Sequence, residues 1–317
     1  MRAGRALRAL ALTIGGLVVL LLGAIAFSWA PDRSVADLSP RWAPAPSKFV
    51  EAAGLRFHVR DEGPRSDSLP IVLLHGTSAS LHTWDGWVQA LSPTRRVVRF
   101  DLPAFGLTGP MPDGDYTMAH YVAVVDALLD SLQLPRVILG GNSFGGQLAV
   151  MVARAHPERV AKLVLVDAAG YPMHSTSVPL AFRIAKTPVL NKLMLVTLPR
   201  ALVESSVRNV YGNPTKVTPE LVDRYYELAL RSGNRGAIAD RFSQAPSDGI
   251  GAEVAQVKVP TLILWGVRDH LIPVENAELF HRDIAGSTLV TFDGLGHVPH
   301  EEDPARTVAA VQRFIAR

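Results

Sequence analysis

A serine, an aspartate and a histidine follow one another along this chain in settings that suit nucleophilic catalysis. Ser143 stands in the run Gly141-Asn142-Ser143-Phe144-Gly145, between an apolar β-branched stretch and a helical pattern. This is the G-x-S-x-G arrangement of a nucleophile elbow, in which a sharp, strained turn from strand to helix exposes the serine hydroxyl. We predict that Ser143 is the nucleophile, at a helix N-terminus that favours a developing anion.

His297 is the predicted base, because a serine hydroxyl is a weak nucleophile until a neighbouring group removes its proton. It lies in a loop after the last predicted strand and before the last helix. Asp269 directly follows another buried strand and is the predicted acid that orients the histidine. Asp167, at the end of the preceding strand, is the rival acid, and the order of such triads along the chain favours Asp269. His300 is the rival base, and we expect it to pack near the final helix.

Backbone amides near Ser143 complete the predicted site. The loop from His75 to Ser80 follows a buried strand and precedes a helix, so its amides can meet that of Phe144, the residue after the nucleophile. Amides in this position stabilise an oxyanion. We expect His75 itself to be structural, and the turn 101–108 to support the site by hydrogen bonds.

The elements that must position these residues alternate between apolar strands and helical patterns, which predicts a parallel sheet with helices on both faces. The carboxyl ends of such strands meet at one edge of the sheet, where ligands bind. A β-hairpin is predicted over 49–60, turning near Ala53-Gly54. Only helical patterns, such as 190–211 and 219–232, fill about 171–250, which predicts a helical cap over that edge. The strands of the main sheet are predicted at 70–75, 96–101, 136–142, 160–167, 260–266 and 287–292, with helices at 117–132, 144–156 and from 304 onward.

An export segment is predicted ahead of this domain. Arg2, Arg5 and Arg8 precede a 22-residue stretch without charge from Ala9 to Ala30. As a helix it spans about 33 Å, close to the ~30 Å core of a bilayer. We predict that residues 1–30 form a membrane anchor that leaves the catalytic domain outside the cytoplasm, periplasmic or extracellular. The alternative is a signal peptide cleaved near Ala24-Ile25-Ala26, which would release a secreted protein.

Composition narrows the class of protein further. The net charge is +3, which the three N-terminal arginines alone account for, and no basic stripe follows, so nucleic acid is not a predicted partner. The chain has no cysteine, which excludes disulfides, thiolate catalysis and cysteine-ligated zinc. The predicted chemistry needs no metal and no organic cofactor. Proline-rich residues 31–47 are predicted as a linker, and 48–317 as one domain that includes the cap.

Five motifs resemble the α/β-hydrolase superfamily over about 49–317, and specifically its members with a helical cap. They are HGTSAS at 75–80, DLPAFG at 101–106, GNSFGG at 141–146, WGVRD at 265–269 and GLGH at 294–297. The resemblance implies the α/β-hydrolase fold and a triad of Ser143, Asp269 and His297. It also implies an oxyanion hole from the amides of Thr77 and Phe144. Ala104 departs from the pattern, since relatives often carry glycine there, and we expect this to affect only local turn geometry.

Particular residues indicate which branch of the family this chain resembles. Serine at the elbow argues against the haloalkane dehalogenases and epoxide hydrolases, which use aspartate. Carbon–carbon hydrolases of ring-cleavage (meta-cleavage) products share GNS-x-GG, but they tend to carry a glycine-rich loop after the HG pair and a tryptophan after the catalytic histidine. This chain has TSAS and Val298 at those places.

We therefore predict a serine hydrolase that cleaves a small carboxylic ester through an acyl-enzyme. Apolar cap residues such as Phe182, Leu190, Leu195 and Leu198 favour an apolar acyl or alcohol group, although each also suits the cap's own core. Three alternatives stay open. They are carbon–carbon hydrolysis, acyl transfer or perhydrolysis by the same triad, and a non-catalytic binding protein on a hydrolase scaffold.

Overall fold

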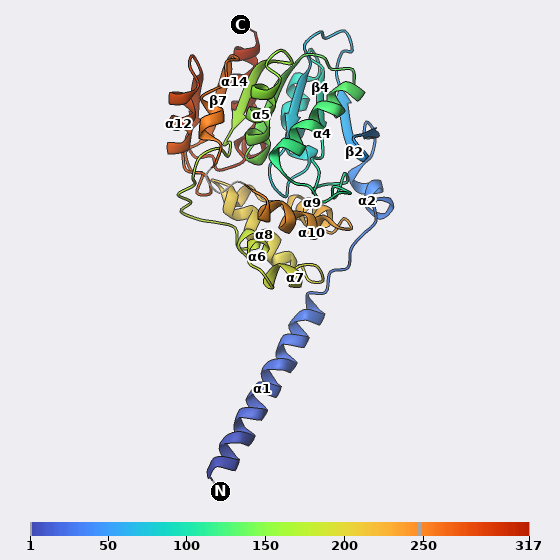
Figure 1. Cartoon of the computed structure of the whole chain (residues 1–317), viewed down its shortest axis with the longest axis vertical. Coiled ribbons are helices and arrows are strands. Elements are labelled where there is room, and N and C mark those ends of the chain that lie inside the picture. The colour runs from blue at the N-terminus through green and yellow to red at the C-terminus, as the bar shows by residue number, and fades with distance from the viewer. Residues whose placement is uncertain (1, 246–248, 317) are drawn as a thin grey trace.

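One mostly parallel sheet runs through the protein (Figure 1). The computed structural model describes residues 2–245 and 249–316, and within them the strands are β1 Lys48–Ala52, β2 Leu55–Glu62, β3 Ile71–Leu74, β4 Val97–Phe100, β5 Val137–Asn142, β6 Val160–Val166, β7 Thr261–Gly266 and β8 Thr288–Phe292. Their order across the sheet is β1-β2-β4-β3-β5-β6-β7-β8. β2 runs antiparallel to β1 and β4, and the other neighbours are parallel. The fold is the α/β-hydrolase fold that the sequence predicts.

Helices cover both faces of the sheet. The helices outside the cap are α2 Val35–Trp42, α3 Asp85–Leu91, α4 Met118–Ser131, α5 Phe144–Ala155, α12 Glu275–Asp283, α13 Pro299–Glu302 and α14 Pro304–Ile315, with the 3-10 turn η1 Leu81–Trp84. α3 and α14 bury their apolar sides against one face, and α4, α5 and α12 against the other. Successive residues of β3 alternate between these two clusters, which is why its sequence is apolar at every position.

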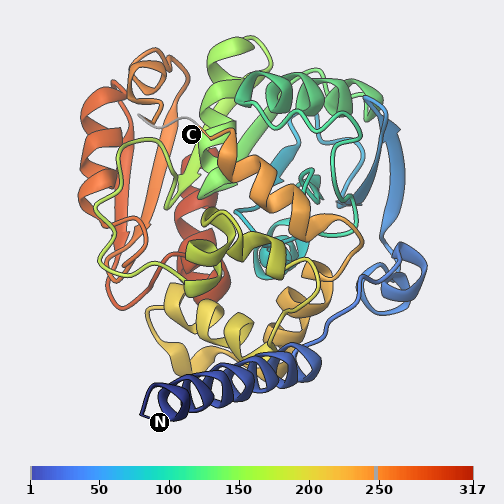
Figure 2. The ribbon, with the colours of Figure 1, turned by 60° about the horizontal axis from the view of Figure 1, so that its bottom comes forward.

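The predicted cap is a set of helices inserted between β6 and β7. Its elements are α6 Leu180–Lys186, α7 Leu190–Leu193, α8 Arg200–Val210, η2 Pro214–Lys216, α9 Pro219–Ala229, α10 Asn234–Ser243 and α11 Gly251–Val254. α11 packs beneath α5 through the buried Val254, whereas α8 and α9 form an apolar cluster of their own. Figures 1 and 2 show α6 to α10 lying over one edge of the sheet.

Most predicted elements are confirmed to within two residues. Thr218 and Asp303 cap α9 and α14 as expected, each accepting an amide of the first turn. The helical pattern 190–211 is broken into α7 and α8, because Pro199 disfavours helical geometry in the residue before it and lacks an N–H. The predicted linker contains α2, which a capping box of Ser34 and Asp37 starts.

The helix α1 (Arg2–Phe27) points away from the sheet on the cap side of the molecule (Figures 1 and 2). Among the residues that the structure describes, no helix combines the length and the apolarity that a membrane span requires.

Residues 29–33, the N-terminal strap, tie the chain after α1 to the cap. Trp29 forms a β-bridge with Thr197, and the Arg33 amide donates to the Leu230 carbonyl at 2.7 Å. Ala30 is buried in the apolar cluster of α8 and α9. The N-terminal segment thus contacts the cap, while the sheet domain begins only at β1.

Candidate active site

Ser143 occupies the turn between β5 and α5, and its backbone has the predicted strain. Its φ of 54° and ψ of −119° are rare for a residue with a side chain. Two glycines allow the close packing: a Cβ on Gly141 would lie 2.2 Å from the Gly145 carbonyl oxygen, and one on Gly145 would lie 2.3 Å from that of Leu74. The first turn of α5 can therefore press against the end of β3 and present the serine at the sheet edge.

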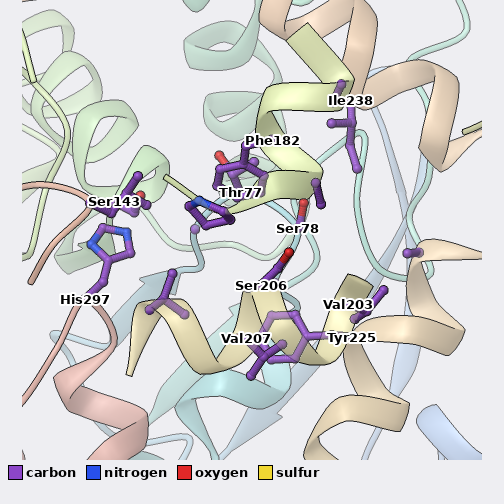
Figure 3. A pocket seen from close by; sticks show the side chains of 18 of the residues that line it. Thr77, Ser78, Ser143, Phe182, Val203, Ser206, Val207, Tyr225, Ile238 and His297 are labelled. Carbon is purple, nitrogen blue, oxygen red and sulfur yellow. The ribbon is translucent and has the colours of Figure 1, made fainter. Parts of the chain in front are cut away.

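His297 and Asp269 lie together at the same edge, after β8 and β7. The His297 Nδ1 is 2.6 Å from Asp269 Oδ2, and both side chains are buried. The other carboxylate oxygen, Oδ1, accepts the amides of Leu271 and Ile272 at 2.8 and 2.9 Å. Because Nδ1 faces the carboxylate, Nε2 is the nitrogen left to take a proton. Figure 3 shows the His297 ring beside Ser143, so the structure brings the three predicted residues together.

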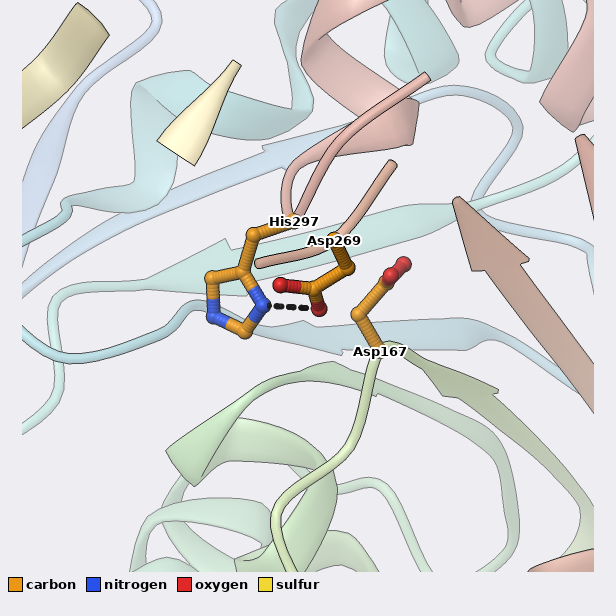
Figure 4. A group of neighbouring side chains, drawn as sticks. All are labelled: Asp167, Asp269 and His297. Atoms are coloured by element: carbon orange, nitrogen blue, oxygen red, sulfur yellow. Dashed lines mark hydrogen bonds and ion pairs between the residues drawn. The ribbon is translucent and has the colours of Figure 1, made fainter. Parts of the chain in front are cut away.

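Asp167, the rival acid, lies on the far side of Asp269 from the histidine (Figure 4). Its Oδ1 accepts the Gly266 amide at 3.0 Å. Burial and the neighbouring charge of Asp269 raise the pKa of Asp167 well above its usual value. An aspartate that keeps its proton is a poor partner for an imidazolium, so this environment favours Asp269 as the orienting acid.

The same three side chains have the types that bind metal ions. Their potential ligand atoms all lie within 4.8 Å of one another. The His297 Nδ1, however, already faces Asp269 at hydrogen-bond distance. The arrangement therefore fits an acid–base pair directly, and no step of the chemistry below depends on a metal.

The loop after β3 reaches the serine. A Cβ on Gly76 would lie 3.1 Å from that of Ser143. The buried His75 ring holds this loop: Nδ1 is 2.7 Å from the Gly76 carbonyl oxygen, and Nε2 accepts the Leu102 amide at 2.9 Å. This pattern requires a neutral ring, and burial lowers the His75 pKa accordingly. Since the peptide group is planar, fixing the Gly76 carbonyl also fixes the N–H of Thr77. His75 is structural, as predicted.

Two further expectations agree with the contacts. Asp101 accepts the amides of Leu81 and Leu107, each at 2.8 Å, so it holds the turn that supports the site. His300 packs its ring 4.1 Å from that of Trp84, measured between centroids, and it is fully buried. Both residues maintain the loops around the site.

Asn142, the residue before the nucleophile, is a positioning residue that the sequence reasoning did not single out. Its Nδ2 donates to the carbonyls of Val166 and His297, each at 3.0 Å. The His297 amide in turn donates to the Val210 carbonyl at 2.8 Å. The backbone of the histidine is therefore held from the elbow on one side and from the cap on the other. The only sequence signal was the Asn142 side chain within GNSFGG, whose partner lies 155 residues away.

Glu302 is a second positioning residue that was missed. Its buried carboxylate accepts the amides of Gly212 and Asn213 at 2.9 and 2.7 Å, and that of Gly296 at 3.0 Å. Gly212 and Asn213 follow α8 of the cap, whereas Gly296 precedes the histidine. One carboxylate therefore fastens the cap to the His297 loop.

Two cavities meet at Ser143. The first, the apolar cavity, has a volume of about 110 Å³ and also touches His297 (Figure 3). Its wall in the cap is mostly hydrocarbon, with Met194, Leu198, Val203, Val207, Val210 and Ile238. The polar side chains of Ser206, Tyr225 and Arg235 also line it. The second, the wide cavity, has a volume of about 550 Å³ and lies on the Phe144 side of the serine, under α6 and α10. A substrate at Ser143 thus has two differently lined spaces for its two ends.

Comparison with known proteins places this geometry in a family. A family model for the alpha/beta hydrolase fold matches residues 70–304. An uncharacterized protein of Mycobacterium tuberculosis is 31% identical over 288 residues, 86% of this chain and 82% of that protein. The 2-hydroxy-6-oxo-2,4-heptadienoate hydrolase of Pseudomonas putida is 30% identical over 281 residues, 85% of this chain and 96% of that enzyme. The crystal structure of a membrane phospholipase A has a TM-score of 0.72 at 23% identity, covering 98% of both chains, a likeness of fold.

The family match spans most of the chain, from β3 to the start of α14, and therefore includes the elbow, the cap and the loops of Asp269 and His297. The identity to the Pseudomonas putida enzyme extends over a similar length. This protein is an enzyme of the α/β-hydrolase family.

Proposed function

We propose that this enzyme is a serine hydrolase that cleaves carboxylic esters with an apolar group through an acyl-enzyme. The observation that carries the proposal is Ser143 at its strained turn, beside a His297 whose Nδ1 is 2.6 Å from the buried Asp269. The apolar cavity that opens at the serine supports a hydrocarbon acyl or alcohol group.

The reaction follows from these positions. His297 Nε2 takes the proton of Ser143 as Oγ attacks the acyl carbon, and the carbonyl oxygen becomes an oxyanion facing the amides of Thr77 and Phe144. The carbon–oxygen bond of the ester then breaks, and His297 returns the proton to the departing alcohol. A water molecule, deprotonated by His297, attacks the acyl-enzyme, and the acid leaves as Ser143 recovers its proton. Asp269 keeps the imidazole oriented throughout.

Labelling with a fluorophosphonate probe tests the nucleophile. The wild-type protein is expected to be labelled covalently, and Ser143→Ala to lose all labelling, because no other activated hydroxyl is proposed. Absence of labelling in folded wild-type protein would favour the non-catalytic scaffold instead. Asn209→Ala, a change in the cap away from the serine, serves as the folded control that keeps its label.

The apolar cavity leads us to predict how activity depends on the length of the substrate's acyl chain. Val207 is buried on α8 and lines this cavity, so Val207→Phe would fill part of it. We expect kcat/KM for a 4-nitrophenyl octanoate to fall about tenfold, the loss of roughly one to two buried methylenes, while the acetate changes little. Ala201→Phe, on an exposed position of the same helix, should leave both values near wild type. Equal losses on both esters would contradict the role of the cavity.

Carbon–carbon hydrolysis is the second candidate. It is favoured by the 30% identity to the Pseudomonas putida heptadienoate hydrolase and by the shared GNS-x-GG pattern. Against it stand Val298, buried after the histidine where that branch tends to carry tryptophan, and the TSAS loop. An assay of 4-nitrophenyl esters beside a ring-cleavage dienone separates the two. A dienone kcat/KM above that of every ester would replace the ester proposal.

We also propose that the catalytic domain works outside the cytoplasm. The support is the run of 22 uncharged residues that follows Arg2, Arg5 and Arg8. Cell fractionation of the tagged full chain tests this location. Recovery of the protein only in the cytoplasmic fraction would contradict the proposal, and N-terminal sequencing would show whether cleavage near Ala26 has occurred.

A further inference from the structure

Arg241, on α10 of the cap, is a buried cation at the active site whose charge the ester mechanism does not use. Its side chain lines the wide cavity, and the residue is 6% exposed. Its Nη2 donates to the Thr77 hydroxyl at 2.9 Å, whereas Nε is buried without a hydrogen-bond partner. Such a group costs free energy unless something else pairs with it.

Three other arginines with buried or largely buried side chains have carboxylate partners. Arg99 pairs with Glu62 at 3.0 Å, Arg224 with Glu301 at 2.8 Å, and Arg235 with Asp32 at 2.6 Å. Arg241 has no carboxylate partner among residues 2–245 and 249–316. Its guanidinium instead lies over aromatic rings and donates to one hydroxyl. Its Cζ lies 4.3 Å from the centroid of Phe144 and 4.7 Å from that of Phe242. Ring faces offset part of the cost of a buried cation, but they leave the Nε of Arg241 without an acceptor.

A second cation faces the same space. Lys186, at the end of α6, lines the wide cavity from its exposed rim, and its Nζ lies 5.0 Å from the centroid of Phe242. Partial desolvation and the charge of Arg241 lower the pKa of Lys186. Burial lowers the pKa of Arg241 to about 10, so its guanidinium stays cationic at neutral pH. None of the described residues that line the wide cavity is acidic.

We propose that Arg241 and Lys186 form a subsite for an anionic group of the substrate, a carboxylate or a phosphate, in the wide cavity, which meets the apolar cavity at Ser143. The substrate of the proposed ester hydrolysis is then an amphiphilic ester, with a hydrocarbon end in the apolar cavity and a charged end in the wide one. Both cavities include Ser143, so one molecule can occupy both while its ester lies at the nucleophile. This inference deepens the proposed function and rests on it.

The test compares charged and neutral esters of matched shape. The first pair is a 4-nitrophenyl ester of a C5 to C8 dicarboxylic acid and its neutral methyl-capped analogue. The second pair is butyryl glycerol 3-phosphate and monobutyrin. We expect wild-type enzyme to prefer the charged member of at least one pair, and Arg241→Met to lower this charged-to-neutral ratio of kcat/KM by about 10- to 100-fold. Loss confined to one pair identifies the anion as a carboxylate or as a phosphate.

Further variants separate the subsite from other roles. Arg241→Lys should recover part of the ratio, and Lys186→Met should lower it by a smaller factor, because Lys186 is exposed. Arg183→Met, on an exposed position of α6 outside both cavities, is the control that should leave the ratio unchanged. If Arg241 acts only by holding Thr77, then Thr77→Val and Arg241→Met lower both members of each pair equally, and the subsite is wrong. A wild-type enzyme without preference for either charged ester would also overturn it.

Binding measurements on an inactive variant test the anion subsite separately from the proposed ester hydrolysis. Ser143→Ala titrated with glutarate and with inorganic phosphate should bind at least one of them, and Arg241→Met added to this variant should weaken that binding at least tenfold. If the wild type cleaves no ester but this binding persists, the ester proposal fails while the anion subsite stands. If esters are cleaved but neither anion binds, only the subsite fails.

Discussion

Two aspartates side by side show how burial and neighbours separate chemical roles. Asp269 accepts two backbone amides on one carboxylate oxygen and faces the histidine ring with the other. Asp167 receives one amide and lies against the charge of Asp269, which favours its protonated form. From sequence alone both are acids at the end of a strand, and only the contacts distinguish them.

Replacement of each aspartate by asparagine measures this difference. Asp269→Asn keeps the shape but removes the charge that orients and stabilises the imidazolium, so kcat on a 4-nitrophenyl ester should fall by about 10³- to 10⁴-fold. Asp167→Asn replaces a carboxyl that already tends to be neutral, and activity should stay within a few-fold of wild type. The reverse ranking would make Asp167 the catalytic acid.

The raised pKa of Asp167 also predicts how stability depends on pH. Above its usual value of 3.8, the unfolded chain loses this proton while the folded protein keeps it. The folded state then binds more protons, so Asp167 makes the free energy of unfolding fall as pH rises from about 4 toward the folded pKa. In Asp167→Asn this fall should be absent, as measured by urea unfolding across that range. Asp293→Asn, at an exposed position, should retain the wild-type slope.

At the scale of elements, the turn after β4 places a residue with a side chain in a backbone conformation that favours glycine. Ala104 has a φ of 79°, in the left-handed region, and its amide donates to the Gly109 carbonyl at 2.7 Å. A side chain in this region costs about 1–2 kcal/mol. This is the position where relatives often carry glycine, so the departure noted in the sequence does affect backbone strain.

Ala104→Gly should therefore stabilise the protein. Relief of the strain exceeds the added entropy of glycine in the unfolded chain, and the net gain in free energy of unfolding should be about 0.5–1 kcal/mol. Ala123→Gly, at an exposed position inside α4, has no strain to relieve and should lose about 1 kcal/mol. Chemical denaturation of both variants checks the prediction, and a destabilised Ala104→Gly would contradict it.

The elements that the sequence predicts well are those whose signals are local. The hairpin β1–β2, the buried strands and the caps at Thr218 and Asp303 each follow from a few adjacent residues. The order of Ser143, Asp269 and His297 also indicated a common edge, because parallel strands end together. Asn142, Glu302 and Arg241 could not be placed this way, since each acts on loops or helices far away in the chain.

At the scale of the whole molecule, the cap is held from two directions. Glu302 fastens it to the His297 loop, and the N-terminal strap fastens it to the segment after α1. Asp32 strengthens the strap, because it accepts from Arg235 at 2.6 Å and from the Gly233 amide at 3.2 Å. Movement of α10, which carries Arg241, is therefore coupled to the N-terminal segment.

Removal of Asp32 should loosen this side of the cap. Asp32→Ala leaves the buried Arg235 without its carboxylate, so we expect a loss of about 1 kcal/mol in local stability. Hydrogen exchange should accelerate about fivefold along α10 and remain unchanged in α5. Asp130→Ala, which removes a partner of Arg159 in the sheet domain, is the matched control. Unchanged exchange along α10 in Asp32→Ala would show that the strap does not restrain the cap.

The strap also has a consequence for the order of events during synthesis. Trp29 pairs with Thr197, and Arg33 donates to Leu230. Leu230 follows Arg33 by close to 200 residues in the chain. At about 5–20 residues per second, a ribosome needs roughly 10–40 s to reach them. Throughout that interval the cap residues that bind the N-terminal strap have not been synthesised. The N-terminal segment is therefore accessible to other cellular factors before it can pack against the cap.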